Sequence, residues 1–237
     1  MKDYNWNLEY PEFISYLKSL KEDRIIKYNK KLIFTKNEII GIPTQELRKI
    51  AKNIAKGDYL SFLKNTTHKY YEEILIEGFV IGQIKEEKTF NRYFNKYINR
   101  IDNWSTCDMV ISSLNLLKEK DNYYTYALSL LNENDEFVMR VGIVIIMYYY
   151  LTQERLDEIF RKIEKLNSEY YYANMATAWL LSVAYVKYPK ETFSFLSNTK
   201  INDFIYNKTI SKIKDSKRIP NRDKQKLKEL KKKRSKK

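Results

Sequence analysis

Glycine, proline, cysteine and histidine are all scarce in this chain. Its 237 residues include five Gly, four Pro, one Cys and one His. So few turn formers argue against a β-sandwich or barrel built from many short strands. One Cys cannot form an intramolecular disulfide, and one Cys with one His cannot supply a zinc-binding set. The sequence therefore predicts a helical, cytoplasmic protein that uses no metal and no cofactor.

Long hydrophobic runs and acidic residues are also in short supply. The most apolar run, residues 141–151, is only about half as long as a membrane span, and no apolar targeting region follows the first residues. We therefore expect no membrane association. The 44 Lys and Arg residues outnumber the 30 Asp and Glu residues, which gives a formal net charge of +14. Such an excess suggests a polyanionic partner such as nucleic acid.

The positive charge is concentrated at the C-terminus. Residues 221–237 contain ten Lys or Arg and two acids, which is +8 of the +14. Such a run is typical of a solvated end, and the rest of the chain is only mildly basic. We therefore expect a globular domain over residues 1–219 and a basic tail over residues 220–237. Lys is much more frequent than Arg, a bias that an A+T-rich genome would also produce.

Apolar residues recur at every third and fourth position through most of the chain, as in residues 47–54. This is the period of an α-helix. Helix start signals occur at Thr44, Asn134 and Thr152. About a dozen helices of roughly 8 to 18 residues are expected, most of them paired at a spacing of about 35 to 40 residues. The predicted fold is all-α, a curved solenoid of antiparallel HEAT-like helix pairs.

Two stretches, residues 139–151 and 173–186, are apolar almost all round. A helix with this pattern is covered on two sides, so both should be inner helices of the solenoid. Tyrosine clusters occur at residues 148–150 and 170–172. They could stack on nucleic-acid bases, but successive residues on a helix point in different directions, and filling the core is the favoured role.

Trp104 and Asp108 are four residues apart, so on a helix both side chains would lie on one face, one turn apart. An indole face attracts a cation by about 0.5 to 2 kcal/mol. A carboxylate about 4 Å from a unit charge contributes about 4 kcal/mol at an effective dielectric constant of 20. The pair therefore suits a cationic ligand. The alternative is that Trp104 fills the core and Asp108 caps a helix or forms a salt bridge.

Two further residues are candidates. Arg140 directly precedes a very apolar run, so it needs an acidic partner or an anionic ligand, and a buried structural ion pair is the alternative. Trp179 follows small residues at 176 and 178, which would let another backbone approach, although it could simply be packed. Cys107 is interpreted as a small buried hydrophobe. His68, in an expected loop, is interpreted as solvated.

Taken in order, these residues lie in stretches that resemble the HEAT-like repeat DNA alkylation repair proteins, the AlkD-like alkylpurine DNA glycosylase family. The matching stretches, within about residues 22 to 219, are 41–52, 102–108, 137–144, 171–182 and the Lys-Tyr-Pro of 187–189. Each pattern is weak alone, but their order and intervals make the resemblance fairly specific.

The resemblance implies a role for each candidate residue. Trp104 and Trp179 would flank the deoxyribose of a damaged nucleotide, Asp108 would sit beside its anomeric carbon, and Arg140 would support the site or contact a phosphate. The damaged base would not be flipped into a pocket, unlike in most glycosylases. The implied partner is double-stranded DNA that is damaged or distorted, and the protein is expected to be a monomer.

The N-terminal region departs from the family pattern. Active members carry a Tyr before the Gly-Ile motif and a Gln after it, where this chain has Leu32 and Pro43. This suggests a subgroup with a reduced N-terminal DNA-binding element. Three functions follow: a glycosylase for N-alkylpurines, a noncatalytic protein that binds distorted or branched DNA, and a protein-interaction scaffold. The first two predict Lys and Arg along the rims of the groove, whereas the scaffold predicts an apolar and acidic concave face.

Overall fold

The computed structural model describes residues 10–118, 120–166 and 169–234. Within these ranges it contains fourteen α-helices, one short 3-10 helix and one π-helix, and its only bridge of β type joins Glu38 and Tyr70. The predicted all-α class is therefore confirmed. Contacts divide the chain into two units, Met1–Lys120 and Asp121–Lys237. Each unit is described below by itself.

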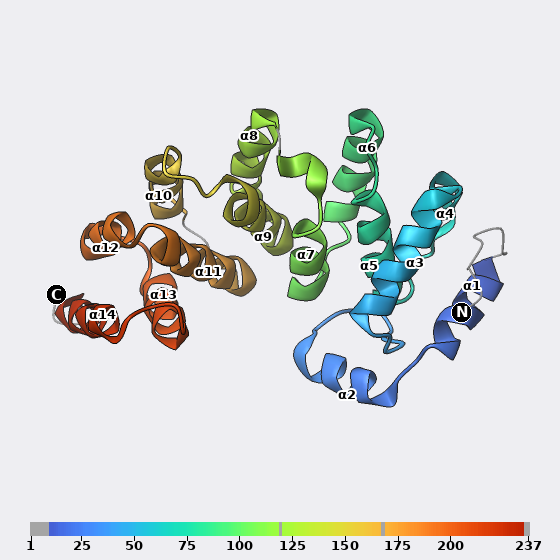
Figure 1. The fold of residues 1–237 in the computed structure, drawn as a ribbon, viewed down its shortest axis with the longest axis horizontal. Coiled ribbons are helices and arrows are strands. Elements are labelled where there is room, and N and C mark those ends of the chain that lie inside the picture. Colours follow the sequence, from blue (N-terminus) through green and yellow to red (C-terminus); the bar gives the residue numbers. More distant parts are fainter. Residues whose placement is uncertain (1–9, 119, 167–168, 235–237) are drawn as a thin grey trace. The chain divides into compact units, whose positions relative to one another are not determined.

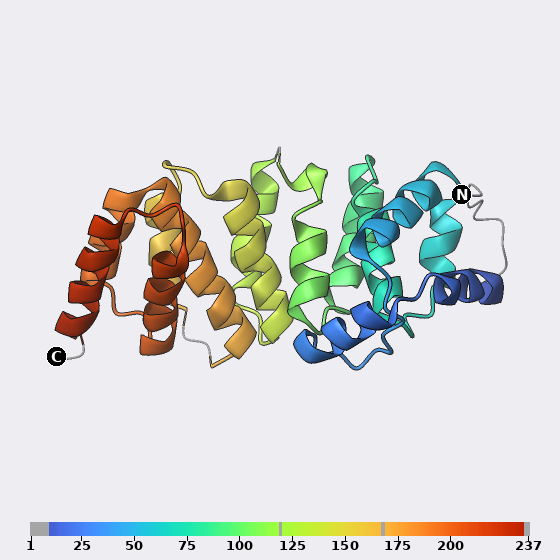
Figure 2. The same cartoon turned by 60° about the horizontal axis from the view of Figure 1, so that its bottom comes forward.

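The N-terminal unit is a series of helices in two layers. Its inner helices α3, α5 and α7 pack side by side, while α4 packs on α3 and α6 packs on α5 (Figures 1 and 2). The helices are α1 (Tyr10–Ser19), α2 (Asp23–Leu32), α3 (Thr44–Lys56), α4 (Tyr59–Asn65), α5 (Tyr71–Ile81), α6 (Glu87–Ile98) and α7 (Trp104–Ile111), followed by the 3-10 helix η1 (Asn115–Lys118).

Helix α5 is the centre of the N-terminal unit. All eleven of its residues are buried, because α3, α6 and α7 all pack against it. A methyl group added at Gly78 would come within 2.5 Å of the Val110 side chain, so the glycine allows α5 and α7 to approach closely. The three glutamates of α5 are buried with the rest of the helix, and the candidate site depends on their partners.

The C-terminal unit repeats the layered pattern. Helices α9, α11 and α13 pack in sequence, while α8, α12 and α14 pack on them in turn (Figure 1). The elements are α8 (Asp121–Leu130), α9 (Glu136–Ile145), the π-helix η2 (Ile146–Tyr150), α10 (Leu156–Glu164), α11 (Tyr171–Lys187), α12 (Pro189–Asn198), α13 (Asp203–Asp215) and α14 (Asn221–Arg234). The two stretches predicted to be inner helices are α9 with η2 and α11, and both predictions are confirmed.

The structure corrects one local prediction and refines another. The helix expected to start at Thr152 begins at Leu156, because residues 153–155 form a turn. The basic C-terminus is solvated as expected but is also folded over residues 221–234, which form α14: most of its described residues are exposed, whereas Leu227 is completely buried. The division at residue 219 stays a prediction. No helix in the described ranges is long and apolar enough to cross a membrane.

Candidate functional site

The predicted pair Trp104 and Asp108 lies on one short helix. The side chain of Asn103 caps α7 by accepting hydrogen bonds from the backbone N–H groups of Ser105 and Thr106, each at 3.0 Å. Trp104 is therefore the first residue of the helix, and Asp108 follows one turn later. Both are partly exposed, whereas Cys107 between them is fully buried, as predicted. The alternative that Trp104 is wholly a core residue does not hold.

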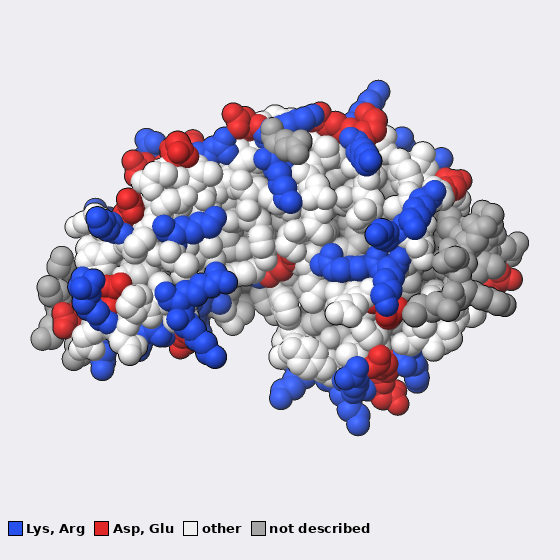
Figure 3. All heavy atoms as spheres, in the orientation of Figure 1, with Lys and Arg blue, Asp and Glu red and all other residues white. Residues whose placement is uncertain are grey.

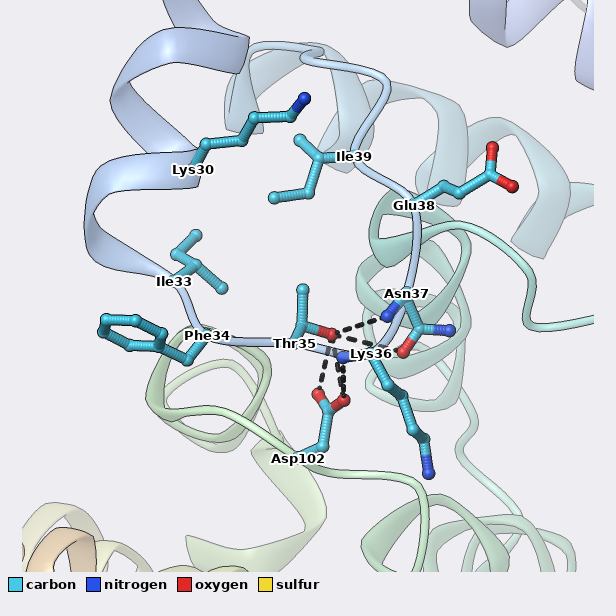
Figure 4. Close-up of a pocket in the computed structure, with 9 residues that line it drawn as sticks. All are labelled: Lys30, Ile33, Phe34, Thr35, Lys36, Asn37, Glu38, Ile39 and Asp102. Atoms are coloured by element: carbon cyan, nitrogen blue, oxygen red, sulfur yellow. Dashed lines mark hydrogen bonds between the residues drawn. The ribbon is translucent and has the colours of Figure 1, made fainter.

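The start of α7 also holds the segment that follows α2. The indole Nε1–H of Trp104 donates to the backbone carbonyl of Leu32 at 3.0 Å. Next to it, the carboxylate of Asp102 accepts hydrogen bonds from the Thr35 hydroxyl at 2.9 Å and the Lys36 backbone N–H at 3.0 Å (Figure 4). The backbone of Leu32, one of the two positions at which we expected a departure from the family pattern, thus fixes the orientation of Trp104. Sequence reasoning quoted Asp102 within a motif but did not recognise this role.

The next part of the same segment is tied to α5. The carboxylate of Glu72 accepts hydrogen bonds from the backbone N–H groups of Ile40 at 2.9 Å and Gly41 at 2.7 Å. Gly41 has a φ of +93°, and a methyl group there would lie 2.3 Å from the Ile26 side chain. Only glycine fits this position. Burial raises the pKa of Glu72, while the hydrogen bonds that the backbone amides donate to its carboxylate oppose that rise.

The other two glutamates of α5 are also occupied by partners within the unit. Glu73 accepts from the backbone N–H of Tyr70 at 2.8 Å and from the Tyr10 hydroxyl, whose pKa burial and this hydrogen bond raise to about 12. Glu77 contacts the guanidinium of Arg100 and the imidazole Nε2 of His68, each at 3.1 Å. The interpretation of His68 as solvated is therefore wrong, because its side chain is only 22% exposed.

In the C-terminal unit, Arg140 is buried in contact with the start of α11. Its Nη1 donates to the carbonyl of Tyr172 at 2.7 Å, and the carboxylate of Glu136 accepts from the backbone N–H of the same residue at 2.5 Å. The Phe137 and Tyr172 rings also pack together, with their centroids 5.2 Å apart. Only 5% of Arg140 is exposed. These contacts tie Arg140 and Glu136 to the first turn of α11.

Trp179 is partly exposed and has an aromatic neighbour that sequence reasoning missed. The Tyr148 ring meets the Trp179 ring edge-on, with centroids 6.0 Å apart and planes at 89°. Tyr148 is 42% exposed, so its predicted role as core filling is wrong, whereas Tyr150 is buried as predicted. The reason is the π-helix over residues 146–150, which changes the direction of successive side chains and cannot be read from an α-helical period.

Trp179 lines a hollow of about 500 Å³ between α11 and the end of α13. Three cations, Lys187, Lys212 and Arg218, line it together with one acid, Asp215. Basic side chains are visible over α13 in the space-filling view (Figure 3). An aromatic surface beside several cations suits a sugar and its phosphates. The signal in the sequence was the Lys-Tyr-Pro stretch, but the other two cations come from distant positions.

A model of the family described as DNA alkylation repair enzyme matches residues 13–223, which is most of both units. The chain belongs to the DNA alkylation repair enzyme family. This confirms the predicted family, and it supports a role in DNA repair with DNA as the partner. The placement in a subgroup stays a prediction. A search of curated proteins finds no significant match to the sequence.

The structure shows where the four candidate residues of the family resemblance lie. Trp104 and Asp108 belong to the N-terminal unit, and Arg140 and Trp179 belong to the C-terminal unit. No group of three or more His, Cys, Asp or Glu side chains in the described residues is arranged to hold a metal ion. The roles of the four residues, and the expectation that no cofactor is needed, stay predictions.

Proposed function

We propose that this member of the DNA alkylation repair family is a DNA glycosylase. Its substrate is double-stranded DNA that carries a cationic N3- or N7-alkylated purine, whose N-glycosidic bond it hydrolyses without flipping the base. The observation that carries the proposal is the pair Trp104 and Asp108, an aromatic ring and a carboxylate one turn apart and both partly exposed on α7. This is a suitable surface for a sugar that becomes positively charged.

The chemistry requires few residues. An N3- or N7-alkylated purine already carries positive charge, so it leaves as a neutral base when the glycosidic bond breaks and needs no general acid. The sugar becomes cationic, and the carboxylate of Asp108 would stabilise it and orient the water that attacks the anomeric carbon. An ordinary glycosidase needs two carboxyl groups for the same task. One partly exposed carboxylate is therefore sufficient here.

Preorganisation supports this proposal. The hydrogen bond from the Trp104 indole to the Leu32 carbonyl fixes the ring before any ligand binds, and productive geometry must be held to a fraction of an ångström. In the C-terminal unit, Trp179 lies beside Tyr148 and lines the cationic hollow. These features support contact with deoxyribose and phosphate, the roles that the family resemblance implies.

The decisive experiment is a single-turnover assay for release of 7-methylguanine and 3-methyladenine from methylated duplex DNA. We expect slow release by the wild type, and loss of most of it in Asp108→Asn, because the carboxylate acts on charge that develops in the transition state. Asp157→Asn is the matched control, since Asp157 is an exposed acid in the first turn of α10. Efficient release of a neutral base such as hypoxanthine would contradict the mechanism.

A noncatalytic role in binding distorted or branched DNA is the second candidate, and Leu32 and Pro43 favour it. Leu32 is 37% exposed and offers no side-chain donor, and Pro43 lies at the N-cap of α3 without a backbone N–H. The Leu32→Tyr, Pro43→Gln double variant tests this. A faster release by the variant supports a weakened glycosylase, whereas intact DNA binding without release by either protein supports the noncatalytic role.

A further inference from the structure

The segment from α2 into the following loop, residues 24–36, combines exposed apolar rings with unbalanced positive charge. None of the ten residues of α2 is buried. Phe34 is 72% exposed, Tyr28 is 63% exposed and Leu32 is 37% exposed. The segment contains five cations and no acid: Arg24, Lys27, Lys30, Lys31 and Lys36. We call it the α2 patch.

The charge of the α2 patch is largely unpaired. Arg24 forms an ion pair with Glu22 at 2.6 Å. In the part of the chain that the structure describes, no ion pair neutralises the four lysines of the patch. Figure 3 shows basic side chains over α2, with acidic side chains beside them at the start of the helix and uncharged surface toward its end. A partner for this surface must therefore carry negative charge and also cover apolar rings.

The loop of the α2 patch is held at several points. The Leu32 carbonyl accepts from Trp104, and the Thr35 hydroxyl and Lys36 N–H donate to Asp102. Phe34 lies between these anchors, and Figure 4 shows its ring turned away from the hydrogen-bonded cluster. Because the chain is anchored on both sides of Phe34, at Leu32 and at Thr35, the ring is kept at the surface. Exposing apolar area to water costs about 25 cal/mol per Å². Covering the Phe34 ring with a ligand would therefore be favourable.

The same loop borders a hollow of about 900 Å³, a size within the range of small-ligand pockets. Ile33 and Ile39 supply apolar wall, and Lys30 and Lys36 supply charge. The carboxylate of Asp102 at its floor is already engaged by the loop. The combination of flat ring, apolar wall and lysines matches a nucleotide, which has an aromatic base and an anionic phosphate.

We propose that the α2 patch binds DNA at an unpaired or displaced base, with Phe34 stacking on the base and the lysines contacting flanking phosphates. This rests on the proposed function in that DNA is the partner. A fully paired duplex covers both faces of each base with its neighbours, so a side chain can stack only where a base step has opened. A second copy of this chain is a poor occupant, because a symmetric contact would bring like charges together.

The test compares two DNA molecules of one sequence, a fully paired duplex and the same duplex with a single unpaired 2-aminopurine. Affinity is measured by fluorescence anisotropy, and stacking is measured by quenching of the 2-aminopurine emission. The variants are Phe34→Ala, the conservative Phe34→Trp, and Leu60→Ala as the matched control, since Leu60 is an exposed apolar residue on α4 of the same unit. Circular dichroism confirms that each variant folds.

We expect Phe34→Ala to lower affinity for the unpaired site by roughly 5- to 150-fold, the range measured for loss of base stacking. Affinity for the paired duplex should stay unchanged, quenching should disappear, and Phe34→Trp should restore both signals. Leu60→Ala should behave as wild type. Neutralising Lys27, Lys30 and Lys31 to Gln should weaken binding to both DNAs and flatten the salt dependence by about 0.9 per lost contact.

Several results would overturn the proposal. Wild-type levels of binding and quenching in Phe34→Ala would show that the α2 patch does not bind an unpaired base. The proposed DNA function would not be affected by that result. Absence of wild-type binding to either DNA would reject the proposed function itself. Tighter binding to single-stranded RNA than to the unpaired DNA would identify a different nucleic acid. A wild-type dimer in sedimentation that Phe34→Ala converts to monomer would show that a second copy covers the ring.

Discussion

The three glutamates of α5 and the aspartate of α7 differ in burial. This difference distinguishes acids that stabilise the fold from an acid that can reach a ligand. Glu72, Glu73 and Glu77 are buried, and each engages a group distant in sequence: the Ile40 amide, the Tyr10 hydroxyl and the Arg100 guanidinium, respectively. Asp108 is partly exposed on the neighbouring helix. A buried carboxylate must be fully compensated by hydrogen bonds or charges, so its partners are structural. A carboxylate that reaches the surface can still act on a ligand, which is the role proposed for Asp108.

The buried acids also bear on the proposed site indirectly. Glu72 fixes Ile40 and Gly41 at one end of the loop, and Asp102 fixes Thr35 and Lys36 at the other. The two acids therefore fix the segment that follows Phe34, while the Trp104 indole holds the Leu32 carbonyl before it. Loss of a scaffold acid should change stability first and DNA binding as a consequence, whereas loss of a site acid should do the reverse.

The largest expected effect is that of Glu72→Ala. The substitution leaves buried backbone N–H groups of the loop without acceptors, and breaking such a buried network costs about 3 to 5 kcal/mol. Thermal melts followed by circular dichroism should show a strongly lowered Tm. Glu46→Ala is the control, because Glu46 forms a partly exposed pair with Lys49 and should cost less than about 1 kcal/mol. Equal losses would remove the distinction between the two kinds of acid.

Arg140→Gln should have an intermediate effect. The guanidinium is buried and donates to the Tyr172 carbonyl at 2.7 Å, and a hydrogen bond from a charged group is worth about 1.5 to 3 kcal/mol. Differential scanning fluorimetry should therefore show a clear loss of stability, larger than for Arg161→Gln on the exposed face of α10. An unchanged Tm together with weakened DNA binding would instead make Arg140 a direct ligand of DNA.

Sequence reasoning predicted the features that depend on local spacing. The 3.6-residue period located most helices, including α3 at Thr44 and the inner helices α9 and α11. The four-residue interval placed Trp104 and Asp108 one turn apart. These succeeded because helical geometry is set by neighbours along the chain.

The missed features depend on partners that are distant in sequence. Glu72 pairs with residues 31 and 32 positions away, and Trp104 pairs with a carbonyl 72 positions away. Nothing in the local pattern indicates that three glutamates in α5 are buried. The exposure of Tyr148 depends on a π-helix, whose extra residue per turn breaks the period used for prediction. Hydrogen bonds between residues distant in sequence, and local departures from α-helical geometry, cannot be predicted from the pattern of a single sequence.

A smaller effect is expected in the pH dependence of stability. Burial raises the folded-state pKa of Glu72 above its ordinary value. The folded chain therefore binds this proton more tightly than the unfolded chain, and the free energy of unfolding falls as pH rises through the raised pKa. The contribution is fully present only below the ordinary carboxyl pKa. Glu72→Gln should remove this part of the slope, as measured by urea unfolding across the acidic range. An unchanged slope would show that the amide donors fully offset burial.

The smallest effect on stability is expected for Asp108→Asn. The side chain is partly exposed, and substitutions at such positions usually change stability by less than about 0.5 kcal/mol. Because Asn keeps the size and much of the hydrogen-bonding capacity of Asp, Tm and DNA affinity should match the wild type within error. The charge is lost, however, and any base excision should be lost with it.

The same variant therefore decides the comparison between α5 and α7. If Asp108→Asn melts much earlier than the wild type, Asp108 is a structural partner like Glu72 and the catalytic proposal is wrong. If it melts with the wild type and still releases 7-methylguanine at the wild-type rate, the carboxylate is neither scaffold nor catalyst. A carboxylate needed for folding would lower the Tm when it is replaced. Only a variant that is stable, binds DNA and fails to release the base therefore identifies a charge that acts in the transition state.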